Sequence, residues 1–215
     1  MTMRGLIVDW GGVLTTALEP SMRRWAAADG IEFAQFQDTM RAWLGNHQGQ
    51  IAAVNPVAAL ERGEMQVPRF EEELASRLAA RSGHEVRADG LLQRMFDHFE
   101  HAPDMAGLVL RAHHAGIRTG LLSNSWGNDY PRDGWDEMFD AVVISGEVRM
   151  RKPEPDIFAH TLELLGTAAS ETVFVDDLRA NIDAAADLGL VGVHHTSYET
   201  TAAELEALFG VPLAE

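Results

Sequence analysis

Five short aliphatic runs, separated by segments with helical spacing, constrain the fold of this chain more than any other feature. Each run is about as long as a β-strand, and none alternates between apolar and polar residues. Such runs are typical of strands that are buried on both faces of a parallel sheet. The runs are Leu6–Val8, Thr119–Leu122, Ala141–Ile144, Thr172–Val175 and Leu190–Val193.

The segments between the later runs carry apolar residues at helical spacing, and a glycine closes each of them as a C-terminal cap would. The predicted helices are Pro103–Ala115, Pro155–Leu165 and Leu178–Leu188. A capping box at 201–204 predicts the start of a last helix, which ends at Gly210. Alternating strands and helices predict right-handed crossovers and an α/β fold with a Rossmann-like, doubly wound parallel sheet.

Residues 18–100 contain no strand-like run and are expected to be all helical. The helices are expected around Pro20–Asp29, Phe33–Leu44, Val57–Arg62, Pro68–Arg81 and Ala88–Phe99. Five helices in succession are more than a single crossover needs, although some of them could instead cover the sheet. We therefore predict a helical cap domain at 18–100, inserted into an α/β core made of 1–17 and 101–215.

Charge and composition narrow the classes of partner. The 215 residues include 33 acidic and 17 basic ones, for a formal net charge of −16, which argues against binding to nucleic acid or to an anionic membrane. The chain has no cysteine, which excludes disulfides, thiolate metal sites and cysteine nucleophiles. No apolar run approaches the ~18 residues of a membrane span, and the N-terminal residues lack a signal-peptide pattern. We expect a cytoplasmic protein that is a monomer or a homodimer.

Chemically active side chains follow four of the predicted strands. Three of the strands lead to these side chains directly, and the third strand along the chain is expected to lead to Lys152 through a loop. These residues are Asp9, Ser123, Asn124, Lys152, Asp176 and Asp177. A lone Asp or Ser at a strand end is often a turn former or a helix cap. In an open parallel sheet, however, ligands bind beyond the carboxyl ends of the strands, and four such ends lie on one edge.

The residue types at this edge suit phosphoryl chemistry. A carboxylate can act as a covalent nucleophile. Carboxylate oxygens suit Mg²⁺, and a hydroxyl, an amide and an ammonium group can hold a phosphoryl group and its developing charge. These residues alone leave open whether the carboxylate attacks phosphorus or carbon.

Four segments, in order along the chain, resemble the motifs of the haloacid dehalogenase superfamily of hydrolases. They are Val8–Thr15, Leu121–Asn124, Arg151–Pro155 and Phe174–Asp177, the last followed by Asn181. The helical insert between the first two motifs is similar to the cap domain of that family. The subgroup that the chain resembles most includes the N-terminal phosphatase domain of soluble epoxide hydrolases.

This resemblance implies roles for individual residues. Asp9 would be the nucleophile of a Mg²⁺-dependent phosphatase that forms an aspartyl-phosphate, with Lys152 as its catalytic partner. The substrate would be a small phosphorylated metabolite. Asp9, the carbonyl of Gly11 and Asp177 would hold the metal. Ser123, Asn124 and Lys152 would bind the phosphoryl group. Asp176 would either bind the metal through water or orient Lys152, and Asn181 would orient its neighbours.

Gly11 departs from the family pattern, because its phosphatases usually carry a second aspartate at this position. That aspartate protonates the leaving group, which is typically worth ~10²–10⁴ in rate. Three alternatives follow: a phosphatase restricted to good leaving groups, a metal-independent 2-haloacid dehalogenase, or a catalytically weak or inactive binding domain. A departing halide needs no proton, but paired aspartates at 176 and 177 favour the phosphatase.

Four further residues lie beside these motifs, and the sequence leaves their roles open. His194 and His195 end the fifth strand at the same edge of the sheet. Trp10 and Trp126 each adjoin a motif, where they would either wall a substrate pocket or fill space between cap and core.

Overall fold

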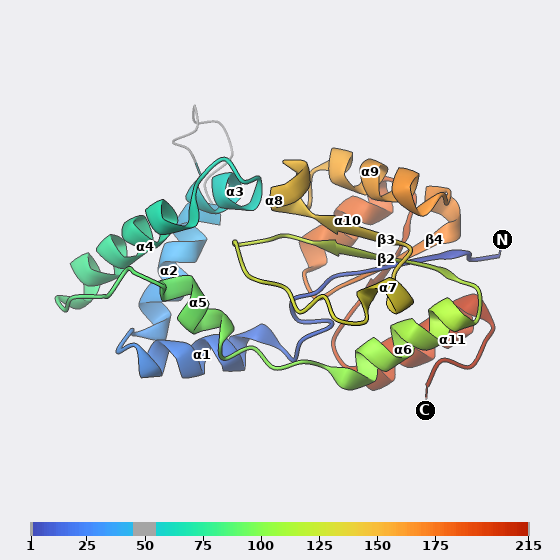
Figure 1. Cartoon of the computed structure of the whole chain (residues 1–215), viewed down its shortest axis with the longest axis horizontal. Helices are drawn as coiled ribbons and strands as arrows, with labels where there is room; N and C mark the ends of the chain where they lie inside the picture. The colour runs from blue at the N-terminus through green and yellow to red at the C-terminus, as the bar shows by residue number, and fades with distance from the viewer. Residues whose placement is uncertain (1, 45–54, 215) are drawn as a thin grey trace.

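The computed structural model describes residues 2–44 and 55–214, and it contains one five-stranded parallel sheet (Figure 1). Its strands are β1 (Gly5–Val8), β2 (Arg118–Ser123), β3 (Ala141–Ile144), β4 (Thr172–Asp176) and β5 (Val191–His194). Their order in the sheet is β3-β2-β1-β4-β5, with every neighbouring pair parallel. The predicted fold class is confirmed, and each strand lies within two residues of its predicted bounds.

Helices cover both faces of the sheet, which explains why the strand sequences do not alternate. Leu6 and Val8 of β1 pack on the side of α6 (Pro103–His114) and α11 (Tyr198–Phe209). Ile7 points to the other side, toward α9 (Pro155–Leu165) and α10 (Arg179–Asp187). In Figure 1, α6 and α11 lie below the sheet, and α9 and α10 lie above it.

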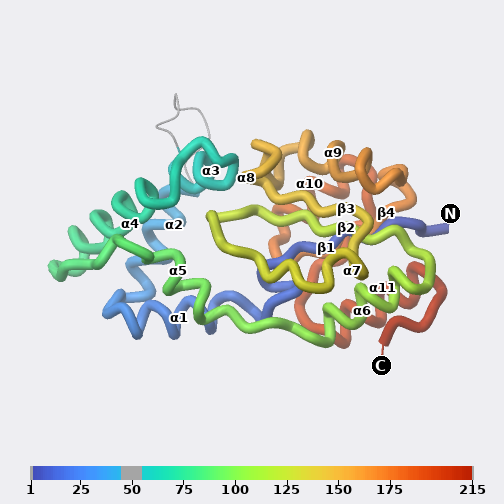
Figure 2. Tube along the Cα trace, in the orientation of Figure 1, coloured from blue at the N-terminus to red at the C-terminus, as the bar shows by residue number. Residues whose placement is uncertain are grey.

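The region between β1 and α6 is helical, as predicted, in its described residues. It contains α1 (Leu18–Ala28), α2 (Phe33–Leu44), α3 (Pro56–Glu61), α4 (Val67–Ser82) and α5 (Leu91–Phe96). These helices pack around an apolar cluster of their own, centred on buried side chains such as Trp25, Phe70 and Leu74. Figure 2 shows the chain leaving β1 for these helices and returning through α6. The exact division into a cap at 18–100 and a core at 1–17 and 101–215 stays a prediction, and its residues 45–54 lie outside the described ones.

Three local predictions were wrong. The last helix begins at Tyr198, because the hydroxyl of Ser197 accepts a hydrogen bond from the amide of Thr200 at 3.3 Å; Thr201 of the predicted capping box is a buried residue inside the helix. Helix α5 begins later than predicted, because Gly90 before it has a left-handed backbone (φ 67°), and it ends at Phe96 rather than Phe99. The predicted loop after β3 contains the short helix α8 (Ser145–Val148).

Two other short helices, α7 (Trp135–Met138) and the 3₁₀ helix η1 (Ala169–Glu171), were also not predicted.

None of the helices in the described ranges combines the length and the apolar character needed to cross a membrane.

Candidate active site

The centre of the sheet brings the first and last motifs together. β1 and β4 are neighbours, with Val8 in register with Val175, and the amide of Asp9 donates to the carbonyl of Val175 at 2.9 Å. The chain changes direction across the sheet at this pair of strands, which is where ligands bind in doubly wound folds. Asp9 therefore lies beside the pair Asp176 and Asp177.

Lys152 joins the two strand ends. Its ammonium nitrogen lies 2.8 Å from Oδ1 of Asp9 and 2.7 Å from Oδ2 of Asp176. The Lys152 and Asp176 side chains are almost completely buried, which is tolerable only for paired charges. Burial alone would lower the pKa of Lys152, but attraction to Asp176 and Asp9 outweighs it, so the pKa is raised above its usual value. Lys152 is thus a fixed cation at neutral pH.

Asp176 uses its carboxylate to hold this lysine. Besides Lys152, it accepts hydrogen bonds from the side-chain amide of Asn181, 3.0 Å from each oxygen, and from the backbone amide of Leu178 at 2.8 Å. Both oxygens of Asp176 are therefore engaged by protein donors. Of the two roles that the sequence left open for Asp176, this geometry favours orienting Lys152, with Asn181 in turn orienting Asp176.

Three carboxylates lie close together at this edge. One oxygen from each of Asp9, Asp176 and Asp177 can be chosen so that all three lie within 4.8 Å of one another. Burial, followed by repulsion from Asp176 and Asp177, raises the pKa of Asp9 to about 7 against the attraction of Lys152. Burial and repulsion from Asp176 likewise raise the pKa of Asp177 to about 6.

The excess negative charge and the oxygen donors fit a divalent cation such as Mg²⁺. Asp9, the Gly11 carbonyl and Asp177 are the groups that would hold it.

The two glycines after Asp9 differ in what they permit. Gly12 has φ 73°, and a Cβ atom built on it would lie 2.4 Å from Oδ2 of Asp177. The close approach of the two loops therefore requires glycine at this position. A Cβ atom on Gly11 would meet only Leu18, at an ordinary contact distance of 3.4 Å, and the backbone there is not left-handed. The structure thus leaves room for a side chain at position 11.

The end of β2 places a serine hydroxyl at the site and an asparagine side chain that binds the backbone of Lys152. The hydroxyl of Ser123 lies 2.9 Å from the hydroxyl of Tyr130, and both side chains are buried. The side-chain amide of Asn124 bonds the backbone of Lys152 twice, accepting from its N–H at 2.8 Å and donating to its carbonyl at 3.0 Å. The Asn124 side chain therefore holds the backbone of Lys152, and its amide nitrogen keeps a second N–H.

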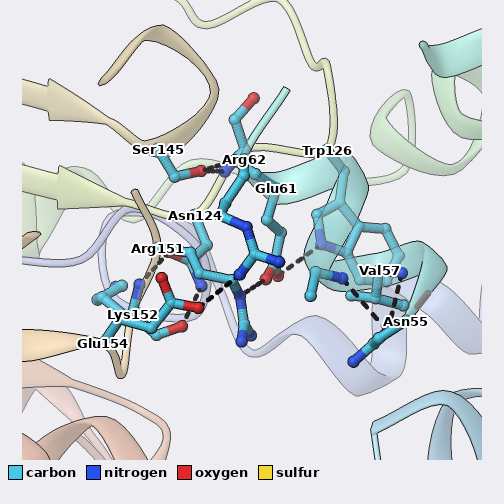
Figure 3. A network of polar contacts seen from close by, with 12 residues as sticks. Asn55, Val57, Glu61, Arg62, Asn124, Trp126, Ser145, Arg151, Lys152 and Glu154 are labelled. Carbon is cyan, nitrogen blue, oxygen red and sulfur yellow. Dashed lines mark hydrogen bonds and ion pairs between the residues drawn. The ribbon is translucent and has the colours of Figure 1, made fainter. Parts of the chain in front are cut away.

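A buried carboxylate of the helical region reaches the core loops, as Figure 3 shows. Glu61 on α3 accepts hydrogen bonds from the indole N–H of Trp126, at 3.0 Å, and from Nε of Arg151. Its backbone carbonyl accepts from the hydroxyl of Ser145 at 2.6 Å. The carboxylate and the backbone of Glu61 thus tie α3 to the loop after β2, to α8 and to the residue before Lys152.

The histidines at the end of β5 hold backbone and helix in place. Nε2 of His194 lies 2.9 Å from the carbonyl oxygen of Asp177, and Nδ1 of His195 lies 2.9 Å from the hydroxyl of Thr201. Burial lowers the pKa of His195. The two tryptophans line a cavity that Asp9 and Asp177 also line. Trp10 meets Tyr130 edge-on with ring centroids 5.0 Å apart, and the ring centroids of Trp126 and Phe70 lie 5.8 Å apart.

The structure thus brings together every residue that the sequence singled out as a site residue, and it adds two. Tyr130 lay in a loop that the sequence placed beside the site without a role. Glu61 gave no signal, because its partners Trp126 and Arg151 are 65 and 90 positions away.

The parallel α/β core and its carboxylate-rich edge together indicate a hydrolytic enzyme. The family model of haloacid dehalogenase-like hydrolases matches residues 3–189. The chain belongs to this family, which confirms the resemblance drawn from its motifs.

Relatives of known name support the same assignment. The chain is 42% identical over 76 residues to a sesquiterpene phosphatase of Aspergillus oryzae, covering 35% of this chain and 38% of that protein. It is 30% identical to mouse acyl-CoA dehydrogenase family member 10, covering 98% and 19%, and 26% identical to pig bifunctional epoxide hydrolase 2, covering 100% and 40%. The chain therefore spans two-fifths or less of the length of these relatives.

Solved structures share the fold. A family enzyme of Bacteroides thetaiotaomicron, solved with magnesium and inorganic phosphate, superposes with a TM-score of 0.62 at 21% identity, covering 90% of this chain and 94% of that one. A dehalogenase superposes with a TM-score of 0.59 at 20% identity, covering 96% of each chain.

Proposed function

We propose that the protein is a Mg²⁺-dependent hydrolase that acts on a small phosphate monoester through an aspartyl-phosphate on Asp9. The observation that carries this proposal is the cluster at the β1–β4 switch point, in which Lys152 bridges Asp9 and Asp176 beside Asp177. The likeness to a sesquiterpene phosphatase and to a fold solved with magnesium and phosphate supports it. The partner is accordingly a phosphorylated small molecule.

The proposed reaction has two steps. A carboxylate oxygen of Asp9 attacks phosphorus, and the bond from phosphorus to the leaving oxygen breaks with its electron pair going to that oxygen, which takes a proton from water. A second water molecule then attacks the phosphorus of the aspartyl-phosphate, releasing inorganic phosphate and the Asp9 carboxylate. Lys152 balances the charge where Asp9 meets the phosphoryl group, and Ser123 donates a hydrogen bond to it. A bound Mg²⁺ would neutralise phosphoryl oxygens.

Gly11 determines which esters react well. No carboxylic acid stands at this position, so the leaving oxygen must depart with little help from a proton. Aryl and acyl phosphates, whose leaving groups are weak bases, are the expected good substrates, and alkyl phosphates lose up to ~10²–10⁴ in rate by comparison with an enzyme that has the acid.

Hydrolysis of p-nitrophenyl phosphate, with Mg²⁺ and with EDTA, is the experiment that decides the proposal. We expect activity that requires both Mg²⁺ and Asp9, so that Asp9→Asn is inactive but folded. Asp156→Asn, which changes an exposed aspartate on α9, is the matched control and should keep full activity. Undiminished turnover by Asp9→Asn would remove Asp9 as the nucleophile.

Gly11 also favours one second candidate, a 2-haloacid dehalogenase, since chloride leaves without a proton. Release of chloride from 2-chloropropionate in EDTA would establish it, whereas the clustered carboxylates support the phosphatase. A protein inactive in both assays would be the binding domain that is the third alternative.

A further inference from the structure

A large cavity extends from the carboxylate cluster into the helical region, and its walls change character along its length. We call it the chamber; its volume is about 600 Å³, within the range of small-molecule sites. One end is formed by Asp9, Ser123 and Lys152. The walls beyond are mostly apolar and come from α1, α2 and α5, with Leu18, Met22, Phe33, Met40, Phe96 and Phe99 among them.

The positions of exposed leucines also indicate that this chamber binds an apolar ligand. Among the described residues, four large apolar side chains are strongly exposed, and two of them, Leu44 (48%) and Leu178 (57%), line the chamber. They come from different parts of the fold, since Leu44 ends α2 and Leu178 precedes α10. Large apolar side chains that gather at an open cavity mark a ligand-binding groove rather than a solvated surface.

The charged side chains of the chamber wall are already paired. Glu19 is bound to Arg23 at 2.6 Å and Arg41 to Asp38 at 3.1 Å, while Glu61 holds Arg151. In the described part of the chain, therefore, the wall beyond the catalytic end offers no unpaired cation to a second anionic group of a ligand. A sugar phosphate would also leave its hydroxyls against apolar walls, which costs binding energy.

We propose that the chamber binds the organic part of the substrate and that this part is an uncharged, extended hydrocarbon body. The substrate is then the monophosphate of an apolar hydroxy compound whose oxygen is a good leaving group, such as a phenol, with its single anionic group at Asp9. The inference rests on the proposed phosphatase activity and names the substrate class that the same site selects. Nucleoside polyphosphates, phosphorylated acids and sugar phosphates are poor ligands on this reasoning.

The test is a series of phenyl phosphates with para-alkyl groups from methyl to hexyl, assayed by phosphate release. The series keeps the leaving group nearly constant, so the missing acid at position 11 affects every member equally. Each methylene that enters the chamber is expected to raise kcat/KM roughly fourfold, mainly through KM, until the chamber is filled. A kcat/KM that does not change with chain length would overturn the inference.

Matched leucine variants locate the effect. Leu44→Gln and Leu178→Gln should flatten the dependence for the longest chains. Leu164→Gln changes an equally exposed leucine (50%) on α9, away from the chamber, and should leave the dependence as in the parent protein. If all three variants behaved alike, the chamber would not be where the alkyl group binds.

Binding of alkylphosphonates to Asp9→Asn separates the two proposals. Affinity that rises from ethyl- to decylphosphonate, in a protein without turnover, would support the chamber even if no ester were hydrolysed. Hydrolysis of p-nitrophenyl phosphate that needs Mg²⁺ and Asp9, with flat alkyl series in both assays, would uphold the phosphatase and overturn the chamber assignment.

Discussion

Removing the charge of Glu61 should destabilise the protein, because this carboxylate is a buried ion-pair partner. Its side chain is 8% exposed and that of Arg151 is 17% exposed. Breaking a buried pair by removing one partner costs ~3–5 kcal/mol. Since water reaches part of Arg151, we expect a cost below this range, about 2–3 kcal/mol, for Glu61→Gln. In a chain of this length that corresponds to a fall in Tm of roughly 4–12 °C.

Thermal and urea unfolding measure this effect directly. The matched control is Glu147→Gln, which breaks an ion pair with Arg132 whose side chains are 56% and 53% exposed; an exposed pair contributes less than about 1 kcal/mol. The double variant Glu61→Gln/Arg151→Met should be more stable than the sum of the single changes predicts. If Glu61→Gln cost no more than the control, the view that α3 is tied to the core through a buried charge would be refuted.

The remaining predictions concern the catalytic edge. Gly11→Asp should fold, because its Cβ would contact only the side chain of Leu18, at 3.4 Å. The variant should raise kcat on alkyl phosphates; no gain would mean that the leaving group takes its proton from another source. Gly12→Ala should lose Mg²⁺-dependent activity, seen by metal titration, because its Cβ would collide with the carboxylate of Asp177. Metal-free protein should become more stable as the pH falls from about 7.5 to 5.5: the raised pKa values of Asp9 (about 7) and Asp177 (about 6) mean that the folded state holds protons that the unfolded state has released, so this stability is lost as the pH rises. Asp9→Asn should reduce that pH dependence of Tm measured in EDTA. Tyr130→Phe should weaken binding of inorganic phosphate and lower kcat/KM several-fold, because the hydroxyl of Ser123 loses its partner at 2.9 Å; unchanged phosphate affinity would argue against that role.

The core and the grouping of polar residues at one edge of the sheet could be predicted because both depend on local sequence patterns. Aliphatic runs mark strands that are buried on both faces, and the parallel order of the strands sends their polar ends to one edge. The grouping of Asp9 with Asp176 needs only these two facts. The start of the last helix was mispredicted, since Ser197 and Thr201 both have side chains that can cap a helix, and burial of Thr201 against the core decides between them.

Long-range side-chain pairing could not be predicted in the same way. Nothing near Glu61 in the sequence distinguishes it from the solvent-exposed glutamates of the chain, and its partner Arg151 lies 90 positions further on. The motif predicted Asn124 near a phosphoryl group, but only the folded loop shows that its side-chain amide also holds the backbone of Lys152.

The candidate site likewise has two parts, the end at Asp9 and the chamber, and different parts of the fold hold them in place. The end of the site at Asp9 is held by contacts within the core, in the series of hydrogen bonds and ion pairs from Asp9 through Lys152 and Asp176 to Asn181. The chamber walls are supplied mainly by α1, α2 and α5, whose own apolar cluster stabilises them. Exposed residues of the walls can therefore change without disturbing the pairing of Lys152. The two proposals together therefore predict that selectivity for the organic part of the substrate and the chemistry at phosphorus are separable by mutation.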